Sequence, residues 1–274
     1  MIKVKNIDAV IIASPTAFHF DHIKMAVNEG KHIFCEKPVD LSYKKVVMVK
    51  ELVNESGIQF MVGFNRRFDP HINQLKIAYD EGRVGKARIS KITRRDPKPP
   101  PLEFFKNSGG LFLDMTIHDI DMARYLVGDE VIQVSSNGTV FGDYPLGEYD
   151  DIDTAVVTLI FKNGCLVQID NSRYCSYGYD QRIEVFGEKG KMLTNNVFEN
   201  SVQISNSSGQ HAARAKYFFL ERYVESYRNI LMNFVENLVN HKPSSISIED
   251  GLAALSIAKA AKKSLQQNQP ITII

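Results

Sequence analysis

Residues 9–38 read AVIIASPTAFHFDHIKMAVNEGKHIFCEKP, and this stretch decides the fold class. The run at 9–13 is continuously apolar and rich in Val and Ile, which is typical of a parallel strand buried on both faces. Apolar side chains at helical spacing follow over 16–30, Gly30 is placed to cap that helix, and HIFCEKP indicates another strand. The order strand, helix, strand predicts one βαβ unit.

Residues 42–64 predict a second unit of the same kind. Ser42 is placed to cap a helix, Gly57 to end it, and the segment IQFMVGF that follows is strand-like. The apolar side chains of this helix, which we expect to face inward, are Val46, Val49, Leu52 and Val53. Residues 1–66 are therefore expected to form part of a doubly wound Rossmann domain.

From residue 67 onward the pattern changes to longer helices and to strands that alternate or carry β-branched runs. Helices are predicted over 70–82, 114–127, 218–241 and 247–266, and strands over 86–96, 131–141, 154–170 and 181–196. Asn163-Gly164 is a hairpin turn signal, and Ser247 opens a sequence that resembles a capping box. We expect residues 67–274 to form an α+β domain with a large, mostly antiparallel open sheet.

Composition narrows the class of partner. The 33 Lys and Arg residues nearly balance 32 Asp and Glu, so no global field would attract nucleic acid or an anionic membrane, and we expect a small-molecule partner. Three cysteines without C-x-x-C spacing argue against a disulfide framework and a structural zinc site, and favour a reducing cytoplasm. The first 19 residues contain only a short apolar run, which predicts neither a signal peptide nor a membrane span.

A lysine stands at the carboxyl end of the second predicted strand, in Cys35-Glu36-Lys37-Pro38. Ligands bind at this edge of parallel sheets. A lysine in such a place is more often a solvated charge, but Glu36 beside it and Pro38 after it favour a positioned ammonium that could bond a substrate hydroxyl.

Asp114 and His118 lie four residues apart and would share one helix face. A lone helical histidine is usually structural, but an aspartate one turn earlier can orient an imidazole, which suits a general base. Metal binding is the rival hypothesis, yet no third ligand stands at a convincing spacing, and His19 with His22 indicates a helix start; we expect no metal.

A polar cluster at 171–182, NSRYCSYGYDQR, contains Tyr177, Tyr179 and Asp180, which could bond sugar-like hydroxyls; the alternative is an ordinary exposed strand edge. No nucleophile elbow, phosphate-binding loop or glycosidase-like carboxylate pair is found in the sequence. Proton abstraction coupled to hydride transfer is the chemistry that these residues favour.

Four spaced motifs resemble the glucose-fructose oxidoreductase and inositol dehydrogenase family (Gfo/Idh/MocA): IIASPTAFH, EKP, GFNRRFDP and GGLFLDMTIHDIDMARYL. The segments RDPKPPP, YGYDQRIEVFGEKG and FFLERYVESYR are similar to the inositol 2-dehydrogenase branch of that family. The resemblance spans nearly the whole chain. It implies a Rossmann domain at 1–66 and a substrate-binding and oligomerisation domain at 67–274, whose outer sheet face forms a tetramer or dimer.

The resemblance also implies roles for individual residues. His118, oriented by Asp114, would accept a hydroxyl proton while NAD, with NADP as the alternative, takes the hydride, and Lys37 would stabilise the charge on oxygen. Cofactor-binding positions are matched by Ser14, Pro15, Thr16, His19, Glu36, Lys37 and Asn65. Substrate hydroxyls would be bound by Arg66, Arg95, Asp96 and Tyr177. Myo-inositol is the expected substrate, and the Lys37-Pro38 peptide bond is expected to be cis.

One feature of the family is absent from the 274 residues: the glycine-rich G-x-G-x-x-G turn that binds the dinucleotide pyrophosphate. We expect at least one βαβ unit to be missing before residue 1. Three explanations are open: a gene model starting at an internal methionine, a shortened non-catalytic protein that binds sugar or forms oligomers, and a sugar-sensing regulator without turnover. The first two define the alternatives of an NAD-dependent polyol dehydrogenase and a truncated, non-catalytic homologue.

Overall fold

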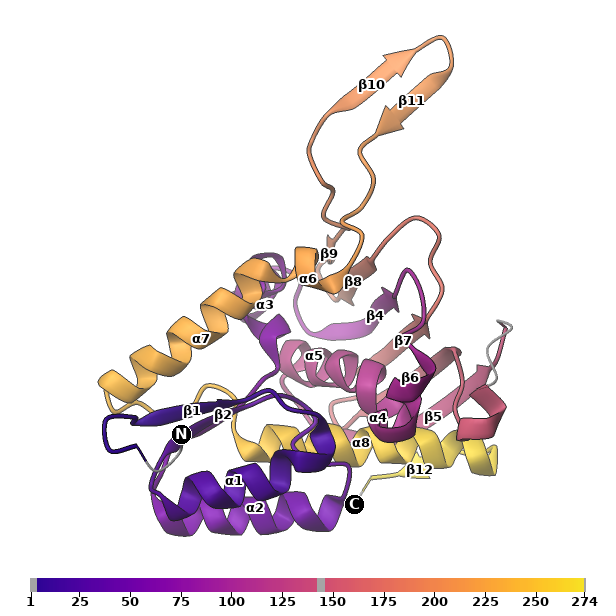
Figure 1. Ribbon diagram of the computed structural model, residues 1–274. Coiled ribbons are helices and arrows are strands. Elements are labelled where there is room, and N and C mark those ends of the chain that lie inside the picture. Colours follow the sequence, from indigo (N-terminus) through magenta and orange to yellow (C-terminus); the bar gives the residue numbers. More distant parts are fainter. Residues whose placement is uncertain (1–3, 142–145, 274) are drawn as a thin grey trace.

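A computed structural model describes residues 4–141 and 146–273 and shows a parallel sheet of three strands (Figure 1). These strands are β1 (Ala9–Ile12), β2 (His32–Cys35) and β3 (Phe60–Val62), in that order. The helices α1 (His19–Asn28) and α2 (Tyr43–Ser56) lie together on one face of the sheet. The two predicted βαβ units are confirmed.

The second sheet has seven strands in the order β12-β5-β6-β7-β4-β8-β9. Strands β4 and β7 are parallel, and the other neighbouring pairs are antiparallel. The bounds are β4 Ala87–Arg95, β5 Val131–Thr139, β6 Thr154–Phe161, β7 Leu166–Ser172, β8 Asp180–Gly187, β9 Lys191–Thr194 and β12 Ile271–Thr272. The mostly antiparallel open sheet expected from the sequence is confirmed.

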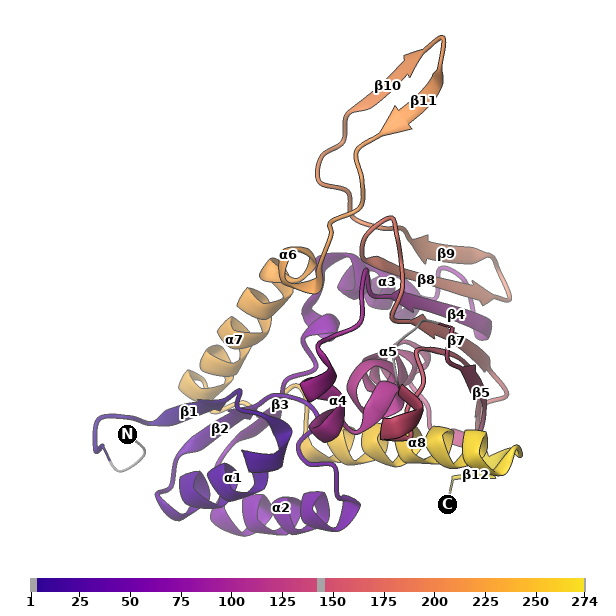
Figure 2. The ribbon, with the colours of Figure 1, turned by 45° about the vertical axis from the view of Figure 1, so that its right-hand side comes forward.

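The helix α8 (Ile248–Gln267) connects the two sheets by packing against both β3 and β5 (Figure 2). Gly251 allows the close approach to the parallel sheet, because a methyl group there would lie only 3.2 Å from Cγ2 of Val62. The backbone N–H of Val62 also donates to the carbonyl of Ile246 at 3.1 Å. One continuous apolar core therefore extends through both parts of the chain.

The remaining helices surround the region between the sheets. They are α3 (Pro70–Asp80), α4 (Leu102–Ser108), α5 (Ile117–Val127), α6 (Phe219–Arg222) and α7 (Val224–Val239). The predicted helix at 114–127 differs in detail, because residues Phe112–Thr116 form a π-helical turn before α5. Helix α4 was not expected, since it follows directly on a proline-rich segment.

A hairpin of β10 (Gln203–Asn206) and β11 (Gly209–Ala212) projects away from the body of the molecule (Figures 1 and 2). All eight of its strand residues are exposed. The sequence did not predict these strands, because the segment lacks an alternating apolar pattern.

Several local expectations concern single residues. The Lys37-Pro38 peptide bond is cis, as predicted. Cys35, Cys165 and Cys175 are free and buried. Within the described ranges, no helix is long and apolar enough to cross a membrane, and no cluster of His, Cys, Asp and Glu is arranged to hold a metal ion.

The two predicted helix caps lead to a matched test. Ser247 accepts from the N–H of Asp250 in a complete capping box, whereas the side chain of Ser42 makes no cap hydrogen bond at the start of α2. We expect Ser247→Ala to lower the free energy of unfolding by about 1 kcal/mol, and Ser42→Ala to change it much less. Urea denaturation followed by circular dichroism measures both, and equal losses would contradict the assignment.

Candidate active site

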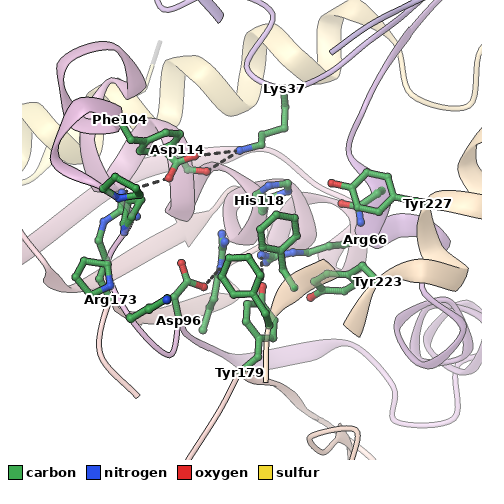
Figure 3. A pocket seen from close by; sticks show the side chains of 18 residues that line it. Lys37, Arg66, Asp96, Phe104, Asp114, His118, Arg173, Tyr179, Tyr223 and Tyr227 are labelled. Atoms are coloured by element: carbon green, nitrogen blue, oxygen red, sulfur yellow. Dashed lines mark hydrogen bonds and ion pairs between the residues drawn. The ribbon is translucent and has the colours of Figure 1, made fainter. Parts of the chain in front are cut away.

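A cavity of about 620 Å³ lies where the carboxyl ends of the parallel strands meet the larger sheet (Figure 3). The cavity lining includes the polar side chains of Lys37, Asp114 and His118. Aromatic and proline side chains from the segment after β4 and from the region of α6 and α7 are interspersed with them. These are Pro99, Pro100, Pro101, Phe104, Phe218, Phe219, Tyr223 and Tyr227.

Lys37 follows β2 and extends across to the π-helical turn. Its Nζ donates to the backbone carbonyl of Asp114 at 2.9 Å and to Asp114 Oδ1 at 3.3 Å, and Arg173 Nη2 donates to the other carboxylate oxygen at 3.3 Å (Figure 3). Burial would raise the pKa of Asp114, but the positive charges of Lys37, Arg173 and Arg94 lower it below its ordinary value. Asp114 is therefore a stable carboxylate between two cations.

This arrangement corrects the expected role of Asp114 toward His118. The hydrogen bonds of the Asp114 side chain in the structure go to Lys37 and Arg173 instead of to the imidazole. Both cations offer charge-assisted hydrogen bonds, which are stronger than a bond from a neutral imidazole. The Asp114 carboxylate is thus bonded to Lys37 and Arg173.

His118 lies at the second residue of α5 and lines the cavity, with its ring packed edge to face on Phe64 at 6.2 Å between centroids. Its Nδ1 is buried and has no hydrogen-bond partner among the described residues. Burial, reinforced by the positive charges of Lys37, Arg66 and Arg94, lowers the pKa of His118 well below its ordinary value. A neutral imidazole of this kind is able to accept a proton.

A buried ion pair between Arg66 and Asp119 lies at the wall of the cavity. Arg66 Nη1 donates to Asp119 Oδ1 at 2.5 Å and Arg66 Nη2 donates to the hydroxyl of Tyr179 at 3.2 Å. The second oxygen of Asp119 accepts from Asn171 Nδ2 at 3.0 Å. These contacts hold the Arg66 guanidinium, which is 1% exposed, at the cavity wall.

Two of the expected substrate residues lie elsewhere. Arg95 donates to Asp170, and Tyr177 is 51% exposed and donates to Asp180; neither of them lines the cavity. Side chains alternate between the faces of a strand, so at the end of β4 it is Arg94 that reaches the cavity.

Asp96 and Arg66, the other two expected substrate residues, do line the cavity, and so does Tyr179 of the polar cluster at 171–182. Arg94 Nη1 donates to the carbonyl of Met115 at 2.7 Å, and its Nε lies 3.5 Å from Asp96 Oδ1. Asp96 therefore presents a carboxylate to the cavity from the segment directly after β4.

The residues matched to cofactor positions follow the three parallel strands. Ser14, Pro15 and Thr16 come after β1, Glu36 and Lys37 after β2, and Asn65 after β3. Asn65 lines the cavity, and its buried Nδ2 has no partner among the described residues. Glu36 is largely buried, which raises the pKa of its carboxyl group. His19 is also buried, and both of its ring nitrogens contact backbone carbonyls.

The sequence did not single out Arg173, Tyr223 and Tyr227, although all three line the cavity. Arg173 belongs to the polar cluster at 171–182. It stands two residues after the inward-facing Asn171, and this spacing could have predicted that its side chain lies on the same face. The tyrosines come from a helix that follows the projecting hairpin, and no local pattern links that helix to β2 or β4.

Comparison with known proteins gives two family matches. Residues 1–64 match the oxidoreductase family with an NAD-binding Rossmann fold, and residues 72–193 match the GFO/IDH/MocA C-terminal domain. The predicted domain boundary at 66/67 lies between these matches and stays a prediction.

The relatives are similar along the whole chain. A myo-inositol 2-dehydrogenase of Thermotoga maritima is 45% identical over 100% of this chain and 82% of its own length. An inositol 2-dehydrogenase of Rhizobium meliloti is 42% identical over 98% of this chain and 81% of its own. The crystal structure of a Lactobacillus casei scyllo-inositol dehydrogenase with bound NAD(H) and scyllo-inositol is 30% identical, with a TM-score of 0.92 over 99% of this chain and 82% of that one.

The buried Arg66–Asp119 pair should be essential for stability. Asp119→Asn would leave the buried guanidinium without its counter-charge, and we expect the free energy of unfolding to fall by about 3–5 kcal/mol. The matched control is Glu199→Gln, which removes the exposed ion pair with Arg214 and should cause no measurable loss. Chemical denaturation measures the free energy of unfolding of both variants. Equal stability of the two would show that the buried pair is dispensable.

Proposed function

The chain belongs to the GFO/IDH/MocA family of NAD-binding oxidoreductases, and on this premise we propose that it oxidises a secondary hydroxyl of a cyclic polyol. The favoured substrate is myo-inositol and the product is a 2-keto-inositol. The observation that carries the proposal is a neutral His118 and the Nζ of Lys37 on the wall of one cavity. The inositol dehydrogenases at 42–45% identity support the same substrate class.

The polar lining of the cavity suits a ring that carries many hydroxyl groups. Asn65 and Arg66 offer donors, and Asp96 offers an acceptor. The buried Nδ2 of Asn65 has no hydrogen-bond partner in the described structure, whereas Oδ1 of Asp96 forms an ion pair with Nε of Arg94 at 3.5 Å. Hydroxyls both donate and accept, so a polyol would satisfy both kinds of group. A purely apolar ligand would leave the Asn65 amide buried and unpaired, which is costly.

The proposed mechanism assigns one task to each of three residues. His118 accepts the proton of the reacting hydroxyl, because its imidazole is held neutral. Lys37 donates to the same oxygen and stabilises the negative charge that develops on it. Asp114 holds the ammonium of Lys37 in place through its carbonyl and its carboxylate.

The residues present also fit a nicotinamide cofactor. The unpartnered Nδ2 of Asn65 stands at the carboxyl end of β3, and Lys37 stands at the end of β2, the edge where such sheets bind dinucleotides. The cavity has room for more than one six-membered ring. NAD supplies the hydride acceptor for the carbinol hydrogen, and Ser14, Pro15, Thr16 and Glu36 are the further residues proposed to lie along it.

We also propose that the outer face of the seven-stranded sheet packs on a second copy of the chain. This face carries apolar side chains that are about two-fifths exposed, including Ile89, Leu166 and Phe186. Exposed apolar patches of this kind mark interaction sites. Identical faces on two copies would bury each other about a two-fold axis.

Turnover of myo-inositol tests the function directly. We expect the purified chain with NAD⁺ and myo-inositol to form reduced cofactor, measured by its absorbance, and His118→Ala to lower kcat by roughly 10²–10⁴-fold. His241→Ala is the matched control, since His241 is exposed beyond α7. Binding of inositol without turnover would instead favour the non-catalytic, sugar-binding alternative.

The interface has its own test. Leu166→Glu combined with Phe186→Glu should lower the mass measured by sedimentation velocity, because two charges would be buried in the contact. Val235→Glu changes a more exposed apolar residue on α7 and should leave the mass unchanged. A mass unaffected by the double change would exclude this face as the interface.

A further inference from the structure

His19 is a buried histidine that the proposed mechanism does not use. It opens α1, its side chain is enclosed, and the residue is 1% exposed. We propose that His19 is a positioning residue, whose two ring nitrogens tie the loop after β1 to the turn that carries Lys37. The inference rests on the proposed function, in which Lys37 acts on the reacting oxygen.

The two ring nitrogens contact two different segments. Nε2 lies 2.7 Å from the carbonyl oxygen of Ser14, and Nδ1 lies 2.9 Å from the carbonyl oxygen of Pro38. Ser14 belongs to the loop that leaves β1, and Pro38 follows Lys37 on the turn that leaves β2. The imidazole therefore connects the carboxyl ends of two adjacent parallel strands.

The other neighbour of the ring is Cys35 on β2, whose Sγ lies 3.6 Å from Nδ1. This thiol also donates to the carbonyl of Glu36 at 3.4 Å, and burial raises the pKa of Cys35 well above its ordinary value. The imidazole is therefore held against β2 by a second contact on its Nδ1 side.

The contact between His19 and Pro38 acts on Lys37 through the backbone. Pro38 is the next residue, and the ammonium of Lys37 must lie close to both Asp114 and the reacting oxygen. A misplacement of about 1 Å at a catalytic group can cost roughly 10²-fold in rate. His22, one turn along α1, provides a contrast, because its Nδ1 contacts only the side chain of Ser14, at 3.1 Å.

The positioning role is tested on the full chain, with His22→Gln as the matched control. His19→Gln replaces the ring by a flexible amide, and we expect kcat to fall by about 10–100-fold with the KM for inositol changed less than about threefold, while His22→Gln keeps both constants. The ¹⁵N signal of the Lys37 ammonium should also shift in His19→Gln. An unchanged kcat and an unchanged Lys37 signal in a folded His19→Gln would overturn the role, whereas absence of turnover in the wild type would count against the proposed function alone.

Discussion

The site depends on one carboxylate that is shared between two cations. Asp114 receives Lys37 from the turn after β2 and Arg173 from the end of β7, so a single side chain joins the parallel sheet to the antiparallel one. Breaking a largely buried pair of this kind leaves an uncompensated charge, which is far more costly than losing a surface ion pair. The relative placement of the two parts at the cavity is therefore set by electrostatics as well as by the apolar core around α8.

The same cations determine the protonation of the neighbouring imidazole. Lys37, Arg66 and Arg94 surround His118, and their positive charge adds to burial in disfavouring the imidazolium. Asp114 remains ionised in the same field. One group is thus held neutral and another charged within a few residues of the same helical segment, which is how general acid–base sites are arranged in other enzymes.

Much of the site was predictable because its residues sit next to strong local signals. Lys37 follows an apolar strand, Asp114 and His118 accompany an apolar helical stripe, and all three line the cavity. The errors at Arg95 and Tyr177 have a common cause. Sequence proximity indicates the right segment, but the face of a strand or the direction of a loop decides which of two nearby residues reaches the cavity. In this structure Arg94 reaches it in place of Arg95, and Tyr179 in place of Tyr177.

The sequence by itself determined the two βαβ units, the mostly antiparallel sheet, the family and the three residues of the proposed chemistry. These follow from periodicity and from short motifs, which are local properties of the chain. Only the tertiary structure decided that the Asp114 carboxylate bonds Lys37 instead of His118, that burial and nearby cations lower the pKa of His118, and that Arg173, Tyr223 and Tyr227 complete the cavity. The physical reason is that hydrogen-bond partners and burial depend on residues far apart in sequence, such as Lys37 and Asp114 or Asp114 and Arg173, which no local pattern brings together.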